Sequence, residues 1–154
     1  MKFLSTNLGE LLPLFDKLDA STKPLWGSMS AQRMVEHLTD VLKIAMGEQV
    51  FPLAIEEEKI PRMLTFLESD KPMMRNIDVP FAVKDIPLRH SEIELAIDEY
   101  AETWLDLEIL FAENPSLKTV HPYYGPLNFD QWERLHSKHL THHFIQFDLI
   151  SEEG

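Results

Sequence analysis

The chain has no cysteine among its 154 residues, which excludes disulfide bonds, thiolate metal ligands and a cysteine nucleophile. Any metal site must therefore be built from histidine, aspartate, glutamate or water. No apolar run approaches the ~20 residues of a membrane-spanning helix. The N-terminal residues also lack the apolar stretch of a signal peptide, because Asn7, Glu10 and Pro13 interrupt it. We therefore expect a cytoplasmic protein.

Positive charge is also scarce in this sequence. Lys and Arg number 14 against 26 Asp and Glu, which gives a formal net charge of −12. Such an excess of acid repels nucleic acid phosphates and anionic membranes, so we expect neither as a partner. The chain length is typical of one domain, which we place over residues 1–154.

Apolar residues in the first third of the chain recur at spacings of three and four, which predicts helices with one buried face. Thr6 is the expected cap of a first helix that runs to about Leu18, with Pro13 as a defect in the pattern. Ser30 is the expected N-cap of a second helix, and Gly47 is expected to end it.

The second half of the chain predicts two longer helices. Ser91 is the expected cap of one that runs to about Glu113. Asn128 and Gln131 have the spacing of a capping box, which predicts the start of a last helix that ends near Leu149.

The segments between these helices are less regular. Pro61 can open a shorter helix that continues to about Leu67. Prolines then interrupt residues 70–89 repeatedly, which predicts an extended crossover, and residues 115–127 predict a loop. Four substantial helices without an alternating strand pattern predict an all-α fold, a four-helix bundle with a long crossover.

Histidines are concentrated in the predicted last helix, where His136, His139, His142 and His143 fall within eight residues. At about 100° per residue, the first, second and fourth of these share one stripe, and His142 turns away from it. Two histidines four residues apart have the geometry of the HExxH zinc proteases. Here Leu140 replaces the protease glutamate, so we do not expect a zinc protease.

Two ligand pairs are possible within this stripe. His139 and His143 are four residues apart, and His136 and His139 form a rival pair at a spacing of three. Because His136 and His143 are two turns, about 10 Å, apart, one ion is not expected to bind all three. We prefer His139 and His143 as ligands. His136 is expected beside them, where it would contact one of the ligand histidines or face the substrate.

A third ligand must come from elsewhere, and His37 is the best candidate because it lies on the apolar face of the second predicted helix. Three neutral imidazoles with open positions for water are typical of a catalytic zinc-type site. The ion can lower the pKa of a bound water to about 7 for hydrolysis. It can instead stabilise the thiolate of a low-molecular-weight thiol, which would be a cosubstrate here.

Several polar residues are candidates for a catalytic role beside such an ion. We select Asp40, His121 and His136, with Tyr123 and Tyr124 as further polar groups in the predicted loop. Each also has an ordinary structural interpretation. Asp40 can be a solvated helix residue, His121 can hydrogen-bond its own loop, and the tyrosines can pack in the core.

Three segments, residues 29–38, 121–127 and 132–147, together resemble the DinB/YfiT-like superfamily. The resemblance spans nearly the whole chain from Leu11 onward. The closest branch is a bacterial domain of unknown function with two signatures, which here read HPYYG at residues 121–125 and KHLTHHFIQF at residues 138–147.

The resemblance implies a four-helix bundle with an unusual connection, often dimeric. It also implies a metal bound by one histidine of the second helix and two of the last, which here are His37, His139 and His143. His136 is an addition to the motif. The superfamily includes thiol-dependent transferases and isomerases and proteins named as hydrolases, but this branch has no activity to transfer.

Our main hypothesis is therefore a metal-dependent enzyme, a hydrolase or a low-molecular-weight-thiol transferase, with a small-molecule substrate and a homodimeric assembly. The ion is divalent, and Ni, Zn, Fe and Mn all remain open. An alternative is a non-catalytic metal-binding or interaction module on the same bundle. A third hypothesis is that the histidines stabilise the core through hydrogen bonds alone.

Overall fold

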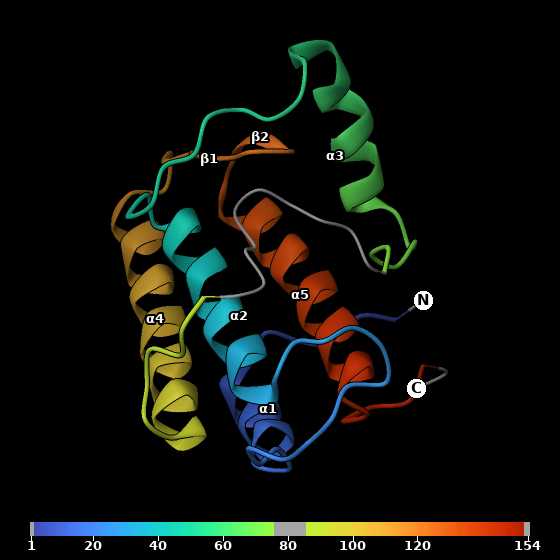
Figure 1. The fold of residues 1–154 in the computed structure, drawn as a ribbon. Coiled ribbons are helices and arrows are strands. Elements are labelled where there is room, and N and C mark those ends of the chain that lie inside the picture. Colours follow the sequence, from blue (N-terminus) through green and yellow to red (C-terminus); the bar gives the residue numbers. More distant parts are fainter. Residues whose placement is uncertain (1, 76–85, 153–154) are drawn as a thin grey trace.

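The computed structural model describes residues 2–75 and 86–152, shown as the coloured ribbon in Figure 1. Within these residues the chain forms five α-helices, one 3-10 turn and a two-stranded antiparallel sheet. The prediction of an all-α four-helix bundle is therefore wrong, although helices dominate. The part of the predicted crossover at residues 76–85 lies outside the described residues. None of the described helices combines the length and apolar character that crossing a membrane requires.

Helix α2, Ala31–Ala45, is the centre of the molecule and lies between α4 and α5 (Figure 1). The Ser30 hydroxyl caps it by accepting a hydrogen bond from the Arg33 backbone N–H at 3.1 Å, as predicted. Gly47, at a φ of +79°, lets the chain turn away after the last residue of the helix. Because neighbours cover it on two sides, even its polar residues Gln32 and Glu36 are buried.

Helix α1, Leu8–Phe15, is shorter than predicted. Its cap is Asn7, not Thr6, since the Asn7 side chain accepts a hydrogen bond from the backbone N–H of Glu10. Pro13 lies inside the helix, where it removes one backbone donor. The helix ends at Phe15, two residues after this proline.

The two long helices of the second half form as expected, with one wrong cap. Helix α4 is Ile93–Glu113, and Glu92 precedes it without any side-chain capping bond, so Ser91 is not its cap. Helix α5 is Phe129–Gln146 and opens with the predicted capping box. In this box Asn128 accepts a hydrogen bond from the Gln131 backbone N–H, and the Gln131 side chain accepts one from the Asn128 N–H, each at 2.9 Å.

The predicted loop at residues 115–127 contains the hairpin that overturns the all-α prediction. Strand β1, Thr119–His121, pairs antiparallel with β2, Gly125–Leu127. Gly125 has a φ of +76°, a conformation that other residues rarely adopt. The Thr119 hydroxyl donates a hydrogen bond of 2.6 Å to the carbonyl of Ala45 at the end of α2. Strands of three residues are too short for an alternating pattern to appear in the sequence.

Helix α3, Ile60–Glu68, follows a 3-10 turn, Glu57–Lys59, and has the predicted proline in its first turn. Its C-terminal end is held on α5 by Lys138, which is fully buried. The Lys138 ammonium donates hydrogen bonds to the carbonyls of Phe66 at 2.7 Å and Ser69 at 3.2 Å. The Arg134 guanidinium donates to the carbonyl of Ser69 as well, at 2.8 Å. Both cations satisfy carbonyls that a helix C-terminus leaves without partners.

We expect the substitution Lys138→Met to lower the free energy of unfolding by about 1.5–3 kcal/mol, the usual contribution of hydrogen bonds to a charged group. The backbone amides at the end of α3 should also lose protection in hydrogen exchange, because the substitution removes the ammonium group that donates to the carbonyls there and holds this end of the helix on α5. Urea unfolding measures the first effect. The control is Lys17→Met, which removes an exposed lysine. Equal destabilisation by both substitutions would contradict the assigned role of Lys138.

Candidate metal centre

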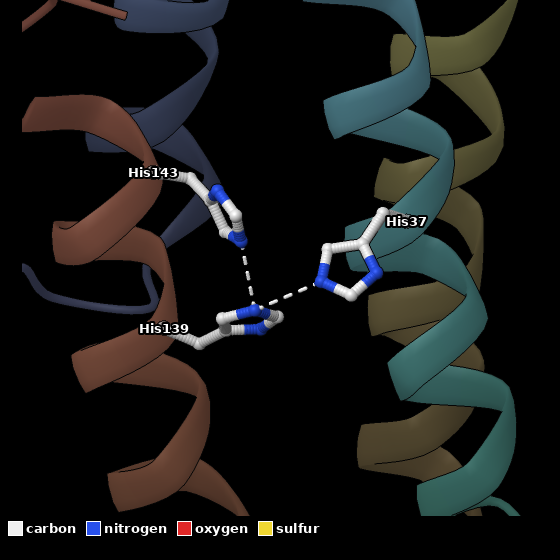
Figure 2. A group of neighbouring side chains, drawn as sticks. All are labelled: His37, His139 and His143. Atoms are coloured by element: carbon white, nitrogen blue, oxygen red, sulfur yellow. Dashed lines mark hydrogen bonds between the residues drawn. The ribbon is translucent and has the colours of Figure 1, made fainter. Parts of the chain in front are cut away.

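The structure brings together His37 from α2 with His139 and His143 from α5 (Figure 2). The Nε2 atom of His139 lies 3.0 Å from that of His37 and 2.9 Å from that of His143. One possible ligand atom from each ring lies within 4.8 Å of the others. The four-residue spacing on α5 places two rings one turn apart on the same side, and α2 presents the third from across the interface.

Burial keeps these three imidazoles neutral. The His37 pKa is lowered to about 4, first by burial and then by the positive charge of Arg33. Burial, together with the neighbouring histidines, holds the pKa of His139 and of His143 well below the usual value. Each ring therefore has one nitrogen with a free lone pair at neutral pH, the form in which histidine binds a metal.

The orientation of His143 is determined by Gln146, one turn further along α5. The Gln146 side-chain N–H donates a hydrogen bond to the Trp26 carbonyl at 3.1 Å. Its oxygen therefore faces His143 and accepts a hydrogen bond from the Nδ1–H at 2.7 Å. The proton of neutral His143 is thus on Nδ1, and the Nε2 lone pair faces the other two histidines. Ligand histidines in metal sites commonly have this kind of partner.

Hydrogen bonds between the three rings cannot satisfy the cluster. The Nε2 of neutral His139 carries either one proton or one lone pair, but two other Nε2 atoms lie within 3.0 Å of it. One cation that accepts several lone pairs resolves this conflict. Two nitrogens bound to one ion at about 2.0–2.1 Å lie at most about 4.2 Å apart. The separations of 2.9 and 3.0 Å from His139 fit this limit, and the ligand atoms of all three rings lie within 4.8 Å of one another. The three histidines could therefore hold a metal ion.

The cluster forms part of the wall of a cavity of about 930 Å³. Met63 and Phe66 of α3 line it as well, as do His121, Tyr123 and Tyr124 of the hairpin. A cavity of this volume is large enough for a small organic molecule. The hairpin, for which the sequence predicts a loop, thus contributes polar groups to the same cavity as the three histidines.

His121 is the one candidate catalytic residue that lines this cavity. Its Nδ1 accepts a hydrogen bond of 3.0 Å from the Tyr123 backbone N–H. Burial lowers its pKa to about 3. Because the neutral ring already uses its Nδ1 lone pair, its proton is on Nε2. His121 is therefore built as a hydrogen-bond donor and not as a general base.

Asp40 is not one of the described residues that line the cavity. Its carboxylate accepts hydrogen bonds from Arg33 at 2.9 Å and from Arg89 at 3.1 Å. It therefore helps to hold the segment before α4 against α2.

His136 lies in the core and not beside the three histidines. Its Nε2 is 2.6 Å from the Tyr100 hydroxyl, and its ring stacks on Trp104 with the centroids 5.0 Å apart. Both partners belong to α4. His136 lies on the same side of α5 as His143, but two turns closer to the start of the helix. At that level α4 packs against α5 and covers the ring. Helical periodicity alone does not show which neighbour lies at each level.

Two further residues of α5, His142 and Gln146, contribute to the site in ways that the sequence did not indicate. His142 is outside the cluster, as predicted, but it lines the cavity and packs against Trp26 with the ring centroids 5.5 Å apart. Gln146 was not selected from the sequence. The available signal was its position three residues after His143, a spacing at which helical side chains meet.

Comparison with known proteins gives one family match. A family model described as "Protein of unknown function (DUF1569)" matches residues 2–149. Neither the curated proteins nor the solved structures contain a match to the chain.

We expect His136 to make stability depend on pH. Its pKa is about 3 in the folded protein, against an ordinary value of 6.5, because burial disfavours the charged ring. Below pH 6.5 the unfolded chain takes up a proton that the folded ring does not. Stability should therefore fall as pH falls from 6.5 toward 3, by about 1.4 kcal/mol per unit from this residue.

Urea unfolding at pH 6.0, 5.5 and 5.0 measures this slope. The substitution His136→Gln should reduce it by about one proton's contribution. Tyr100→Phe is the matched control, because it removes the same hydrogen bond and keeps the titrating ring. Unchanged pH dependence in His136→Gln would contradict the assignment.

Proposed function

The chain belongs to the DUF1569 family, and we propose that it is a divalent-metal-dependent enzyme that acts on a small molecule. One observation carries this proposal. Three neutral histidines with converging nitrogens form part of the wall of a cavity of about 930 Å³. A structural metal site is normally closed by four protein ligands, whereas a catalytic site keeps a position open toward the substrate.

In this proposal His37, His139 and His143 bind the ion, and Gln146 keeps the His143 lone pair directed at it. Because all three ligands are uncharged, they leave the full positive charge of the ion in place. Such an ion supplies Lewis-acid chemistry, which lowers the pKa of a bound water or thiol. A ligand set of imidazoles suits Zn, Ni and Fe, and suits Mn less well.

Hydrolysis and thiol transfer place different demands on the cavity. Water has a much higher intrinsic pKa than a thiol, for which about 8.5 is usual, so it needs more help from a base. No described residue that lines the cavity has a carboxylate, and His121 already uses its lone pair. These features favour thiol transfer over hydrolysis. The resemblance to the DinB/YfiT-like superfamily, which includes thiol-dependent transferases, supports the same choice.

We expect protein purified without a histidine tag and loaded with Zn²⁺ to retain about one ion per chain after gel filtration. His37→Ala and His143→Ala should each lose most of this metal, because each removes one of three ligands. Elemental analysis by mass spectrometry measures it. His142→Ala is the control, because it removes a neighbouring histidine outside the cluster. Metal content that is low in the parent protein and unchanged in His143→Ala would refute the metal site.

The same proteins distinguish the two reactions. Metal-loaded protein and His143→Ala are assayed in parallel with an aryl ester, and with a small thiol plus an activated aryl halide. We expect the metal-loaded protein to be faster than His143→Ala only in the assay with the thiol and the aryl halide. A difference in the first alone would instead show a hydrolase. Identical rates in both assays would assign the ion a non-catalytic role.

We expect Gln146→Leu to weaken metal binding by about 10–100-fold, the usual effect of removing a hydrogen-bond partner of a ligand histidine. Gln146→Glu keeps an acceptor for the Nδ1–H of His143, so it should retain most of the affinity. Competition with a chromophoric chelator measures both values. Equal losses in the two variants would show that Gln146 acts through its hydrogen bond to the Trp26 carbonyl, which both substitutions remove, and not through His143.

A further inference from the structure

The cavity differs in charge from the rest of the molecule. The chain has 26 acidic residues in 154, a frequency that gives about four among the 22 described residues lining the cavity. None of these 22 is Asp or Glu, and two, Arg62 and Lys71, are basic. A protein with a net charge of −12 therefore has a cavity whose described wall is cationic.

The two cations flank the cavity at opposite ends of α3. Arg62 lies in the first turn of this helix, and Lys71 lies just after its last residue. Both are exposed, and neither forms an ion pair with a described acidic residue. The nearby cations of α5 are already used, since Lys138 and Arg134 donate to the carbonyls at the end of α3. Arg62 and Lys71 thus remain available to a ligand in the cavity.

Between these cations the wall is largely apolar. Met63 and Phe66 lie on α3 itself, Met73 and Met74 follow it, and Leu135 lies on α5. Methionine side chains are flexible and polarizable, so such a wall adapts to apolar groups of different shape. An apolar surface with cationic groups at its edge is complementary to a molecule that is apolar along its body and negatively charged at one end.

We propose that the cavity binds a small organic anion with an apolar body, and that Arg62 and Lys71 select for its negative charge. As a statement about the substrate, this rests on the proposed function, because the anion would be presented to the three histidines. The anion preference itself comes from side chains of α3 and of the segment after it. The acidic exterior disfavours anions at long range, so the selection depends on these two side chains at the edge of the cavity.

Two fluorescent probes of similar aromatic shape test the charge preference. One is the anion 8-anilinonaphthalene-1-sulfonate, and the other is the uncharged N-phenyl-1-naphthylamine. Both are titrated into the folded full chain at neutral pH, with and without Zn²⁺. We expect Arg62→Gln and Lys71→Gln each to weaken binding of the anion about 2–5-fold, as for one exposed charge pair. Binding of the uncharged probe should not change.

The matched control is Lys17→Gln, which changes the net charge equally at an exposed position outside the cavity. An equal loss of anion binding in Lys17→Gln, or equal effects on both probes, would overturn the proposal. A protein that binds no metal but still prefers the anion would refute the proposed metal-dependent function and leave the proposed anion site standing. Retained metal binding without any anion preference would refute the anion site alone.

Discussion

The architecture depends on the burial of α2 between α4 and α5, where only Asp40 and Lys43 remain partly exposed. A helix buried on several sides must satisfy nearly all of the polar groups that it carries. Among the buried side-chain nitrogens and oxygens of α2, only the Nη1 of Arg33 lacks a hydrogen-bond partner in the described part of the chain, and it lies 3.7 Å from the Glu36 carboxylate. The Glu36 carboxylate, which is fully buried, accepts hydrogen bonds from the backbone N–H groups of Arg89 at 2.7 Å and His90 at 3.2 Å. These bonds attach the segment before α4 to α2. With α2 immobilised in this way, His37 is held at a fixed position opposite α5.

Helix α5 carries two functions on different sides. Lys138 and His139 are adjacent in the sequence, yet Lys138 holds the end of α3 and His139 faces His37. The ammonium group donates to three carbonyls, those of Phe66, Leu67 and Ser69. A positive charge next to the histidine cluster would repel a bound cation. These hydrogen bonds direct the Lys138 ammonium group toward the end of α3 and away from the cluster. The same bonds place α3 as a wall of the cavity.

The sequence predicts several features that depend on local chemistry, although the predicted caps at Thr6 and Ser91 are wrong. The caps at Ser30 and Asn128 and the turn at Gly47 follow from hydrogen bonding and backbone freedom within a few residues. Features that depend on distant neighbours are missed. His136 meets Tyr100 because of how α4 crosses α5, and helical periodicity contains no such information. The bond from Gln146 to Trp26 spans 120 residues, and the hairpin strands are too short to leave a pattern.

The histidine cluster and the cationic part of the described cavity wall come from different segments of the chain. Helices α2 and α5 supply every histidine of the cluster. Helix α3, the segment after it and the hairpin supply both cations, both tyrosines and three of the four methionines of the described wall. The proposed reactivity and the proposed selectivity therefore depend largely on different residues. Substitutions in α3 can redirect the cavity toward another molecule without disturbing His37, His139 or His143. Under the proposed function, a change of substrate would therefore require substitutions in only one of these two parts.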